Sequence, residues 1–342
     1  MIRIGIVGIG AMGAGHANQI ASGAVPGAEL AAVCDADSKR LEAFPDTEHF
    51  TDHKKMFDSG AIDAVMIATP HYFHTPLSLD AIQAGIHLLV DKPLGVHKAD
   101  CERTIKAYED RDRQDLVFAV MFNQRTRPIY RKLKSLIDNG ELGKIRRINW
   151  TITDWFRSEF YFRAGGWRAT WKGEGGGVLL NQCPHQLDLM QWLFGMPCRV
   201  RSFGALGKYH EIEVEDEVTS YLEYPDGTTG VFIASTGEAP GTNRLEIAAE
   251  RGRLIIENDE ISWLRNEIPT AEFSSSTTER FAKPPVWEVR VPVEEATVQE
   301  HAAVIGAFVK AVSGEGNLIA EGIEGIRSVE LGNAMLYSML KD

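Results

Sequence analysis

The sequence is short of several features that would assign it to a particular class of protein. Its four cysteines have no CxxC spacing, so we expect reduced thiols of the kind found in a cytoplasm. Lys and Arg total 36 against 48 Asp and Glu, and the net charge of −12 argues against nucleic acid or an anionic membrane as a partner. No apolar run approaches the ~20 residues of a membrane span, and we find no internal repeat. The first residues already form a predicted strand, so no signal peptide is expected.

The 342 residues suffice for two domains, and a content of 44% hydrophobic and 25% charged residues is typical of a globular protein.

The N-terminal segment carries the most specific pattern in the chain. Arg3 to Val7 is a short apolar run. A helix-compatible segment over residues 14–21 and a second apolar run that ends at Asp35 come later. Between the first run and the helix lie Gly8, Ile9, Gly10, Ala11, Met12 and Gly13.

A strand, a glycine turn, a helix, a second strand and an acidic residue, in this order, form a dinucleotide-binding fingerprint. The glycines permit a tight turn, an approach of the backbone to a pyrophosphate and close packing of helix on strand. The alternative is a glycine turn that only eases packing. Asp35 favours NAD over NADP, because a carboxylate accepts from the ribose 2′-hydroxyl and repels a 2′-phosphate. Lys39 and Arg40 are close enough in sequence to weaken that preference.

Strand and helix patterns alternate up to about residue 122. Predicted strands cover residues 64–68, 87–90 and 117–121, and predicted helices cover 52–59, 75–84 and 99–110. Repeated βα units of this kind predict a doubly wound parallel sheet of the Rossmann type. We assign it to a first, nucleotide-binding domain of residues 1–122.

The pattern changes from about residue 123. A helix over 128–139 precedes predicted strands at 145–155, 214–224, 228–235, 244–249 and 253–257, with a hairpin turn at Tyr224–Thr228. Residues 274–278 are expected to form a polar loop, and helices near 298–312 and 322–340 close the chain. We therefore predict an α+β domain over residues 123–342 with a largely antiparallel sheet. Its last helices either stay with it or pack back on the first domain.

Lys92 directly follows a predicted parallel strand, and ligands of open α/β sheets bind at the carboxyl ends of strands. Asp91 and Pro93 define a sharp exit from that strand, where a cis peptide is compatible with the sequence. A lysine in such a cleft can donate to a substrate oxygen and help to move its proton. The alternative is a surface lysine at a strand end.

A second candidate segment runs from Gly175 to Asp188. Glycines lead into an apolar run, and a helix begins near Pro184, so the helix N-terminus favours the neutral form of His185. Asp188 shares a helix face with His185 and is expected to orient its ring, and Asn181 is expected to cap the helix. His185 is therefore a candidate base, against the alternative of a structural histidine.

Two further segments are predicted to line ligand sites. The loop after the strand at 64–68 is expected to face the nicotinamide through Thr69, Pro70, His71 and His74. We predict a pocket wall there and no metal site, because the spacing supplies no third ligand. Residues 155–171 are rich in rings and donors, which suits a sugar, unless this loop only packs on the second domain. Its substrate-binding candidates are Trp155, Tyr161, Arg163, Trp167 and Arg168.

Taken together, these segments resemble the glucose–fructose oxidoreductase / inositol dehydrogenase / rhizopine-catabolism (Gfo/Idh/MocA) family over nearly the whole chain. The resemblance rests on the fingerprint continued through His16, on the segment from Thr69 to His74, on Asp91-Lys92-Pro93 and on residues 175–188. It implies a Rossmann domain, a C-terminal domain with a large open sheet and an active site between them. It also implies reversible hydride transfer between NAD and a secondary alcohol of a sugar, sugar derivative or cyclitol. Homodimers or homotetramers formed through the open sheet are usual in the family.

Carried over by position, the resemblance makes Lys92 and His185 catalytic, with Asp91 in place of the usual glutamate. Asn181 stands where many members that oxidise sugars or inositols have aspartate, and an amide binds a hydroxyl but takes up no proton at neutral pH. Asn181, Asp188, His185 and Lys92 are thus expected to bind substrate. The cofactor site is expected to comprise residues 8–13, Asp35, Thr69, Pro70, His71, His74 and Lys92.

Two other functions fit the same fold. One is glycoside cleavage with catalytic use of NAD, which would release a sugar without net formation of NADH. The other is a nucleotide-sensing regulator without catalysis. The presence of both Lys92 and His185 argues against the regulator, and Asn181 argues slightly for it.

Overall fold

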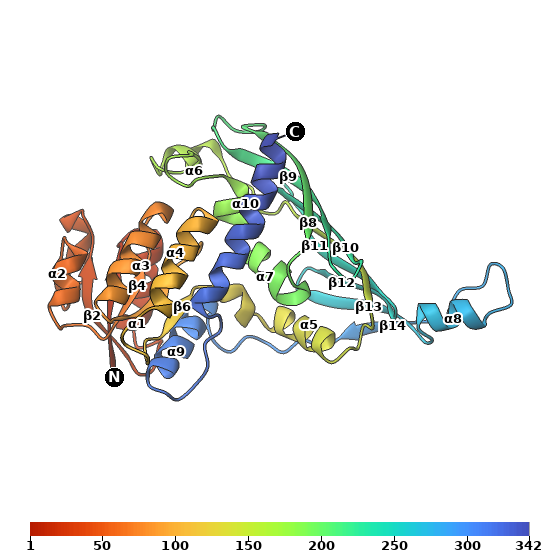
Figure 1. The fold of residues 1–342 in the computed structure, drawn as a ribbon, viewed down its shortest axis with the longest axis horizontal. Coiled ribbons are helices and arrows are strands. Elements are labelled where there is room, and N and C mark those ends of the chain that lie inside the picture. Colours follow the sequence, from red (N-terminus) through yellow and green to blue (C-terminus); the bar gives the residue numbers. More distant parts are fainter. Residues whose placement is uncertain (342) are drawn as a thin grey trace. The chain divides into compact units, whose positions relative to one another are not determined.

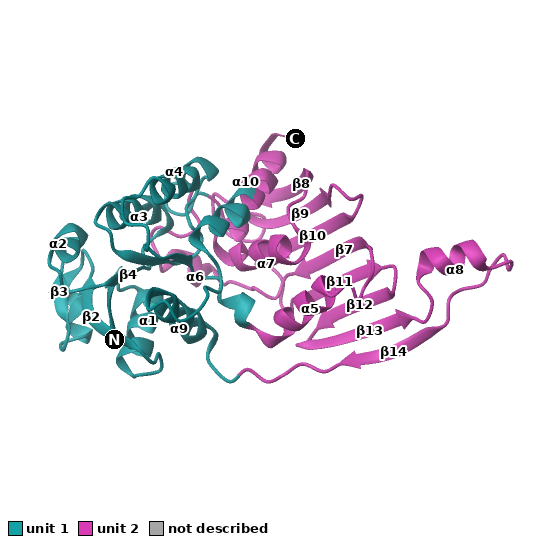
Figure 2. Ribbon diagram, turned by 60° about the horizontal axis from the view of Figure 1, so that its bottom comes forward, with its two compact units in different colours: residues 1–126, 172–175, 297–330 teal, residues 127–171, 176–296, 331–342 magenta. Residues whose placement is uncertain are grey.

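The computed structural model describes residues 1–341, and their internal contacts divide them into two compact units. Unit 1 comprises residues 1–126, 172–175 and 297–330 (Figure 2). Unit 2 comprises residues 127–171, 176–296 and the described chain from residue 331 onward. No helix among residues 1–341 is both long enough and apolar enough to cross a lipid bilayer.

Unit 1 is built on a six-stranded parallel sheet in the order β3-β2-β1-β4-β5-β6. Its strands are β1 (Ile2–Val7), β2 (Ala28–Cys34), β3 (Glu48–Phe50), β4 (Ala64–Ile67), β5 (His87–Val90) and β6 (Phe118–Val120). Its α-helices are α1 (Ala11–Ala21), α2 (His53–Asp58), α3 (His74–Gln83), α4 (Lys98–Glu109) and α9 (Glu300–Val312). Short 3₁₀ turns are η1 (Ser38–Ala43), η2 (His71–Phe73), η3 (Asn123–Thr126) and η5 (Gly322–Glu324). The predicted doubly wound parallel sheet is confirmed.

Helices cover both faces of this sheet because successive side chains of each strand point to opposite sides. On one face, Ile6 of β1 and Met66 of β4 pack with α1 and α9, for example on Phe308. On the other face, Val65 of β4 packs with α2, α3 and α4, for example on Leu77. Figure 2 shows α3 and α4 on one side of the sheet and α1 and α9 on the other.

The unit boundaries differ from the predicted division at residue 122. Unit 1 extends to Thr126, and it also includes residues 172–175 and 297–330, so α9 belongs to unit 1, which is one of the two arrangements expected for the last helices. The helix α9 carries buried Ala302, Ile305 and Phe308 at a spacing of three residues, and this stripe completes the core against β1 and β4. An apolar stripe predicts burial, but it does not specify which sheet will bury it.

Unit 2 contains an eight-stranded sheet in the order β14-β13-β12-β11-β7-β10-β9-β8. Its strands are β7 (Ile145–Ile152), β8 (Arg199–Leu206), β9 (Glu215–Glu223), β10 (Thr229–Ser235), β11 (Asn243–Ala249), β12 (Gly252–Glu257), β13 (Glu260–Asn266) and β14 (Val286–Val291). Neighbouring strands are antiparallel except β7 and β10, which are parallel. The helices of this unit are α5 (Pro128–Asp138), α6 (Glu159–Arg163), the π-helical turn η4 (Val178–Gln182), α7 (Pro184–Phe194), α8 (Thr270–Ser276) and the later part of α10 (Gly325–Lys341).

One face of this sheet is buried beneath helices. Trp150 of β7 is fully buried in a core that includes Tyr130 of α5, Leu187 of α7 and Met335 of α10. Figure 1 shows α5 and α7 on the same side of the strands. On the other face, Phe203 of β8 is 59% exposed and Tyr221 of β9 is 44% exposed. The predicted mostly antiparallel sheet is confirmed, and so is the predicted hairpin, since β9 and β10 pair across the Tyr224–Thr228 turn.

The prediction of a polar loop over residues 274–278 is wrong for most of its length. Residues Thr270–Ser276 form α8, and no side chain of this helix is buried. Ser275 Oγ donates to the Glu272 carbonyl within the helix. Because α8 has no apolar stripe, hydrophobic periodicity gave no sign of it. The strands β3, β8, β13 and β14 and the helix α6 were likewise missed.

Replacement of Phe308 by alanine is expected to destabilise unit 1 by about 3–5 kcal/mol, since the ring is 0% exposed in the shared core of β1, β4 and α9. Chemical denaturation of the variant and of the wild-type protein would measure the difference. The control is Phe281→Ala in unit 2, where the ring is 86% exposed and the same change should alter stability by less than about 0.5 kcal/mol. Equal effects of the two substitutions would contradict the assignment of α9 to this core.

Candidate functional site: a dinucleotide turn and a buried ionisable cluster

The glycine turn between β1 and α1 leaves no room for side chains at two positions and ample room at a third. Gly8 has φ +94°, and a Cβ added at Gly13 would lie 1.8 Å from the Gly8 carbonyl oxygen. At Gly10 the nearest atom to an added Cβ is Arg40 Nη1, at 4.0 Å. No side chain caps the N-terminus of α1. The open face at Gly10 and the uncapped helix end fit a pyrophosphate, which the N–H groups of the first turn would hold.

Asp35 lies one residue after β2 and is tied to this turn. The Ile9 N–H donates to Asp35 Oδ2 at 2.7 Å, and the Asp37 N–H donates to Oδ1 at 2.9 Å. Arg40 Nη1 lies 3.4 Å from Oδ2, on a largely exposed side chain. The carboxylate thus holds the turn in place at the end of β2, with a cation beside it. The residues present fit an adenine dinucleotide.

The loop after β4 brings two buried histidines beside the segment after β5. His74 is 1% exposed, with Nδ1 2.7 Å from the Pro93 carbonyl oxygen and Nε2 2.8 Å from the Thr69 carbonyl oxygen. His71 is also buried, and its Nδ1 lies 3.4 Å from the Glu174 carbonyl oxygen. Burial, together with the charges of His74 and Lys92, holds the pKa of His71 well below its usual value. His71 is therefore a neutral imidazole at physiological pH.

Asp91 and Lys92 lie at the carboxyl end of β5, as predicted, and the Lys92–Pro93 peptide is cis. The Lys92 backbone N–H donates to Asp91 Oδ1 at 2.8 Å. His16 Nε2 lies 3.5 Å from Asp91 Oδ2, and the rings of His16 and His301 are 5.4 Å apart. Burial raises the pKa of Asp91, but His16, Lys92 and His74 outweigh it and hold that pKa well below the usual range. Asp91 is therefore a buried carboxylate.

Sequence reasoning did not assign His16 and His301 to the site. The sequence could have indicated His16, because this residue follows the glycine fingerprint within α1. His301 lies on α9, far along the chain, and no local pattern connects it with Lys92. Burial lowers the pKa of His301, and the neighbouring His16 lowers it further.

In unit 2, the glycine segment before His185 is anchored on β9. Glu215 is fully buried, and its carboxylate accepts from the Gly177 N–H at 2.8 Å and the Leu179 N–H at 3.1 Å. A Cβ added at Gly177 would lie 2.0 Å from the Glu215 carbonyl oxygen. Pro184 begins α7 and His185 follows in its first turn, as predicted, with a half-buried side chain.

The prediction that Asn181 caps α7 is wrong. The N-cap residue is Cys183, and no side chain caps the helix. Asn181 instead lies within η4, where its N–H donates to the Gly177 carbonyl oxygen. The π-helical turn ends at Gln182, directly before the N-cap residue. Asp188 is buried, and its Oδ1 accepts from Gln191 Nε2 at 2.9 Å.

The aromatic segment over residues 155–171 is organised around Tyr161. Arg168 Nη1 donates to the Tyr161 hydroxyl at 2.7 Å, and its guanidinium carbon is 4.7 Å from the centre of that ring and 5.0 Å from that of Trp167. Trp155 packs against the core of unit 2. A cavity of about 620 Å³ is lined by Arg163 and Arg168, among others. The structure thus places two of the predicted substrate residues on a cavity within unit 2.

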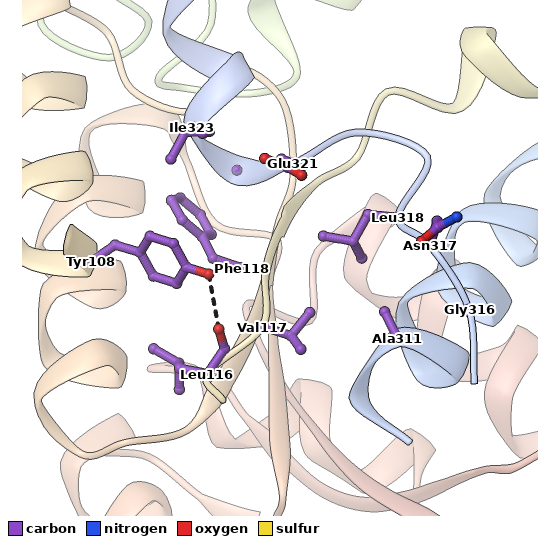
Figure 3. A pocket seen from close by; sticks show the side chains of 11 residues that line it. Tyr108, Leu116, Val117, Phe118, Ala311, Gly316, Asn317, Leu318, Glu321 and Ile323 are labelled. Atoms are coloured by element: carbon purple, nitrogen blue, oxygen red, sulfur yellow. Dashed lines mark hydrogen bonds between the residues drawn. The ribbon is translucent and has the colours of Figure 1, made fainter. Parts of the chain in front are cut away.

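Unit 1 has a separate cavity of about 370 Å³ at the β6 edge of its sheet (Figure 3). Tyr108, Phe118, Leu318 and Glu321 contribute to its lining, and the Tyr108 hydroxyl donates to the Leu116 carbonyl oxygen at 2.9 Å. None of the predicted cofactor or substrate residues lines this cavity. It is therefore not part of the candidate cofactor site.

Comparison with known proteins agrees with this geometry. Residues 2–119 match a family model described as "Oxidoreductase family, NAD-binding Rossmann fold", and residues 130–255 match the GFO/IDH/MocA C-terminal domain. Inositol 2-dehydrogenase of Corynebacterium glutamicum is 28% identical over 198 residues, which are 57% of this chain and 54% of the relative. Myo-inositol 2-dehydrogenase of Thermotoga maritima is 25% identical over 267 residues, which are 75% of each chain. The match to the first relative thus spans about half of that relative's length.

Solved structures share the fold over nearly the whole chain. The WlbA dehydrogenase from Bordetella pertussis, in complex with NADH and UDP-GlcNAcA, superposes with a TM-score of 0.82. The match covers 99% of this chain and 96% of that chain at 24% sequence identity.

The substitution Gly13→Ala is expected to abolish measurable NADH binding, because its Cβ would lie 1.8 Å from the Gly8 carbonyl oxygen and force α1 away from β1. The matched control is Gly15→Ala in the same helix, where nothing lies within 4 Å of an added Cβ. Titration of NADH by its fluorescence would measure both variants. Retained binding in Gly13→Ala, or equal loss in Gly15→Ala, would contradict the role of this turn.

Proposed function

Because this chain belongs to the GFO/IDH/MocA family of NAD-binding oxidoreductases, we propose that it transfers a hydride reversibly between NAD and a secondary alcohol of a sugar, sugar derivative or cyclitol. One observation carries the proposal. A lysine follows β5 at the carboxyl end of the same parallel sheet in which the turn after β1 fits a dinucleotide. The inositol dehydrogenases among the relatives support the class of substrate.

The residues of the chain have separate tasks. When bound, NAD would supply the acceptor for the hydride of the carbinol carbon. Residues 8–13 and the N-terminus of α1 hold the pyrophosphate, and Asp35 accepts from the ribose. His185 takes the hydroxyl proton as a general base, and Lys92 donates to a substrate oxygen and stabilises the charge that develops on it.

Substrate recognition is assigned to side chains of unit 2. Asn181 binds a hydroxyl without taking up its proton, and Asp188 supports the first turns of α7. Tyr161 and Trp167 supply ring faces for a sugar, and the neighbouring guanidinium groups supply donors. The assignment of Tyr161, Trp167 and Arg168 rests on the packing of the Arg168 guanidinium against both rings.

The protein is proposed to act in a cytoplasm as a homodimer or homotetramer. Cys34 and Cys101 are buried, and burial raises the pKa of each thiol to about 12, which suits reduced and unreactive cysteines. The uncovered face of the unit 2 sheet exposes Phe203 and Tyr221, and a second copy of the chain would bury these rings.

Replacement of Lys92 by alanine is expected to lower turnover about 100- to 1,000-fold, because the substrate oxygen loses its cationic donor. NADH formation over cyclitols, aldoses and anhydrosugars would measure turnover, and NADH fluorescence would show affinity within about twofold of the wild type. The control is Lys98→Ala, since Lys98 is exposed and pairs with Glu330. Unchanged turnover in Lys92→Ala would exclude Lys92 from the reaction.

We propose that Asp35 gives the protein a preference for NAD over NADP and that the nearby Arg40 weakens this preference. The substitution Asp35→Asn removes the charge that repels a 2′-phosphate and leaves Arg40 beside the site. The ratio of kcat/KM for NAD to that for NADP should fall about tenfold or more, which corresponds to about 1.4 kcal/mol. Asp46→Asn on the exposed surface is the control. An unchanged ratio would assign the preference to other residues.

A further inference from the structure

The two edges of the unit 2 sheet differ in what lies beside them. At the β8 edge, the Ser202 N–H donates to Ser338 Oγ of α10 at 3.0 Å, and a Cβ added at Gly204 would lie 2.4 Å from Met339 Sδ. At the other edge, β14 pairs with β13, and no further strand among residues 1–341 pairs with it. Figure 2 shows β14 as the outer strand on that side of the sheet. The β14 edge is therefore a place where another strand can pair.

The backbone groups of every second residue of β14 point away from β13. The Glu267 N–H donates to the Pro285 carbonyl oxygen at 2.9 Å, and the antiparallel register continues from there along β14. Because hydrogen-bonded and non-hydrogen-bonded pairs alternate in an antiparallel ladder, the first, third and fifth residues of β14 direct their N–H and C=O groups outward. These residues are Val286, Glu288 and Arg290.

The side chains of β14 lie on two faces of the sheet. Val289 is directed to the core side, where its cross-strand neighbour on β13 is the buried Trp263. Glu288 and Arg290 lie on the opposite face, and both are exposed. Arg290 Nη2 donates to Glu260 Oε2 at 2.9 Å, and a guanidinium has further N–H groups for a second carboxylate. The outer edge thus carries one anion and one cation, two residues apart on one face.

We propose that the β14 edge binds the β14 edge of a second copy of this chain, in an antiparallel pairing with its two-fold axis at Val289. Such a pairing sets outward-directed residues opposite one another. Centred on Val289, it places Glu288 opposite Arg290 of the second copy, and by symmetry Arg290 opposite Glu288. Centred on Glu288, it would place two carboxylates against each other, which destabilises a sheet. Charge complementarity therefore selects the register centred on Val289.

The same register covers apolar side chains that a single chain leaves exposed. Trp287 is 53% exposed, and in the pair it faces Val291 of the second copy on the core side of the joined sheets. Val289 meets its own counterpart at the axis. Positions 283 and 295 also correspond in this two-fold relation, so the exposed Lys283 is directed toward the exposed Glu295. A two-fold contact closes on itself, so the pairing ends with two copies at this edge.

This contact is distinct from an assembly through the open face of the sheet. The exposed rings of that face, Phe203 and Tyr221, lie on β8 and β9, at the opposite end of the strand order from β14. The β14 contact also involves neither a cofactor nor a substrate. It can therefore be tested whether or not the chain oxidises an alcohol.

Two charge reversals test the pairing and its register together. Glu288→Arg would set two cations against each other at both contacts, and Arg290→Glu would set two anions against each other. Either substitution alone should raise the dissociation constant of the β14 contact about tenfold or more, because two attractive contacts become repulsive. An equimolar mixture of the two variants should restore the assembly, since each contact then joins opposite charges.

Sedimentation velocity over a concentration series would measure these assemblies. Asp46→Arg, an exposed charge reversal in unit 1, is the control and should assemble as the wild type does. Unchanged assembly of both single variants, or no restoration on mixing, would overturn the proposal. A wild-type protein that remains monomeric throughout the series would leave this edge to a strand of another protein and would also overturn it.

A cysteine at the axis gives an independent measure of the register. Val289→Cys, combined with Cys198→Ser to remove the exposed native thiol, brings two thiols together at a non-hydrogen-bonded pair, where the Cα separation suits a disulfide. Mild oxidation should cross-link most of this protein, and a further Tyr221→Ser substitution on the open face should not change the yield. Val286→Cys in the same background should cross-link little, because its counterpart is Pro292. Equal cross-linking at positions 286 and 289, or none at 289, would overturn the proposal.

Discussion

The parallel pairing of β1, β4 and β5 is the constraint on which the candidate site in unit 1 depends. Parallel neighbours end at the same edge, so the glycine turn after β1, the turn at Thr69 and the Asp91-Lys92 segment emerge together. The His74 ring joins the last two of these turns through backbone carbonyls. The sheet places the ends of these strands at one edge, and the His74 ring connects the turn after β4 with the turn after β5 at that edge.

A carboxylate is costly to bury unless neighbouring cations or hydrogen-bond donors compensate its negative charge. Asp91 is compensated by His16, Lys92 and His74, which together keep its pKa low despite burial. His16 Nε2 lies 3.5 Å from Asp91 Oδ2, and the His301 ring lies 5.4 Å from the His16 ring, so the helices α1 and α9 on the same face of the sheet bring both histidines to this part of the site.

Patterns that depend on neighbouring residues were predictable from the sequence. The strand–turn–helix at residues 2–21, the exit at Lys92 and the start of α7 at Pro184 each follow from local propensity and spacing. Features that depend on contacts between residues far apart in the sequence could not be predicted in this way. The packing of α9 on β1, the approach of His301 to His16 and the anchoring of Gly177 by Glu215 join residues far apart in sequence. The failed prediction for Asn181 has a local cause, because a π-helical turn is rare and leaves no periodic signal.

Hydride transfer is tested most directly by following deuterium from a carbinol carbon to the nicotinamide. The protein would be incubated with NAD and cyclitols or sugars deuterated at their carbinol carbons, and the reduced cofactor would be analysed by mass spectrometry. The proposed function predicts deuterated NADH in an amount equal to the oxidised product. Sugar release from a glycoside without net reduced cofactor, or tight NAD binding with no reduction of any substrate in the panel, would contradict it.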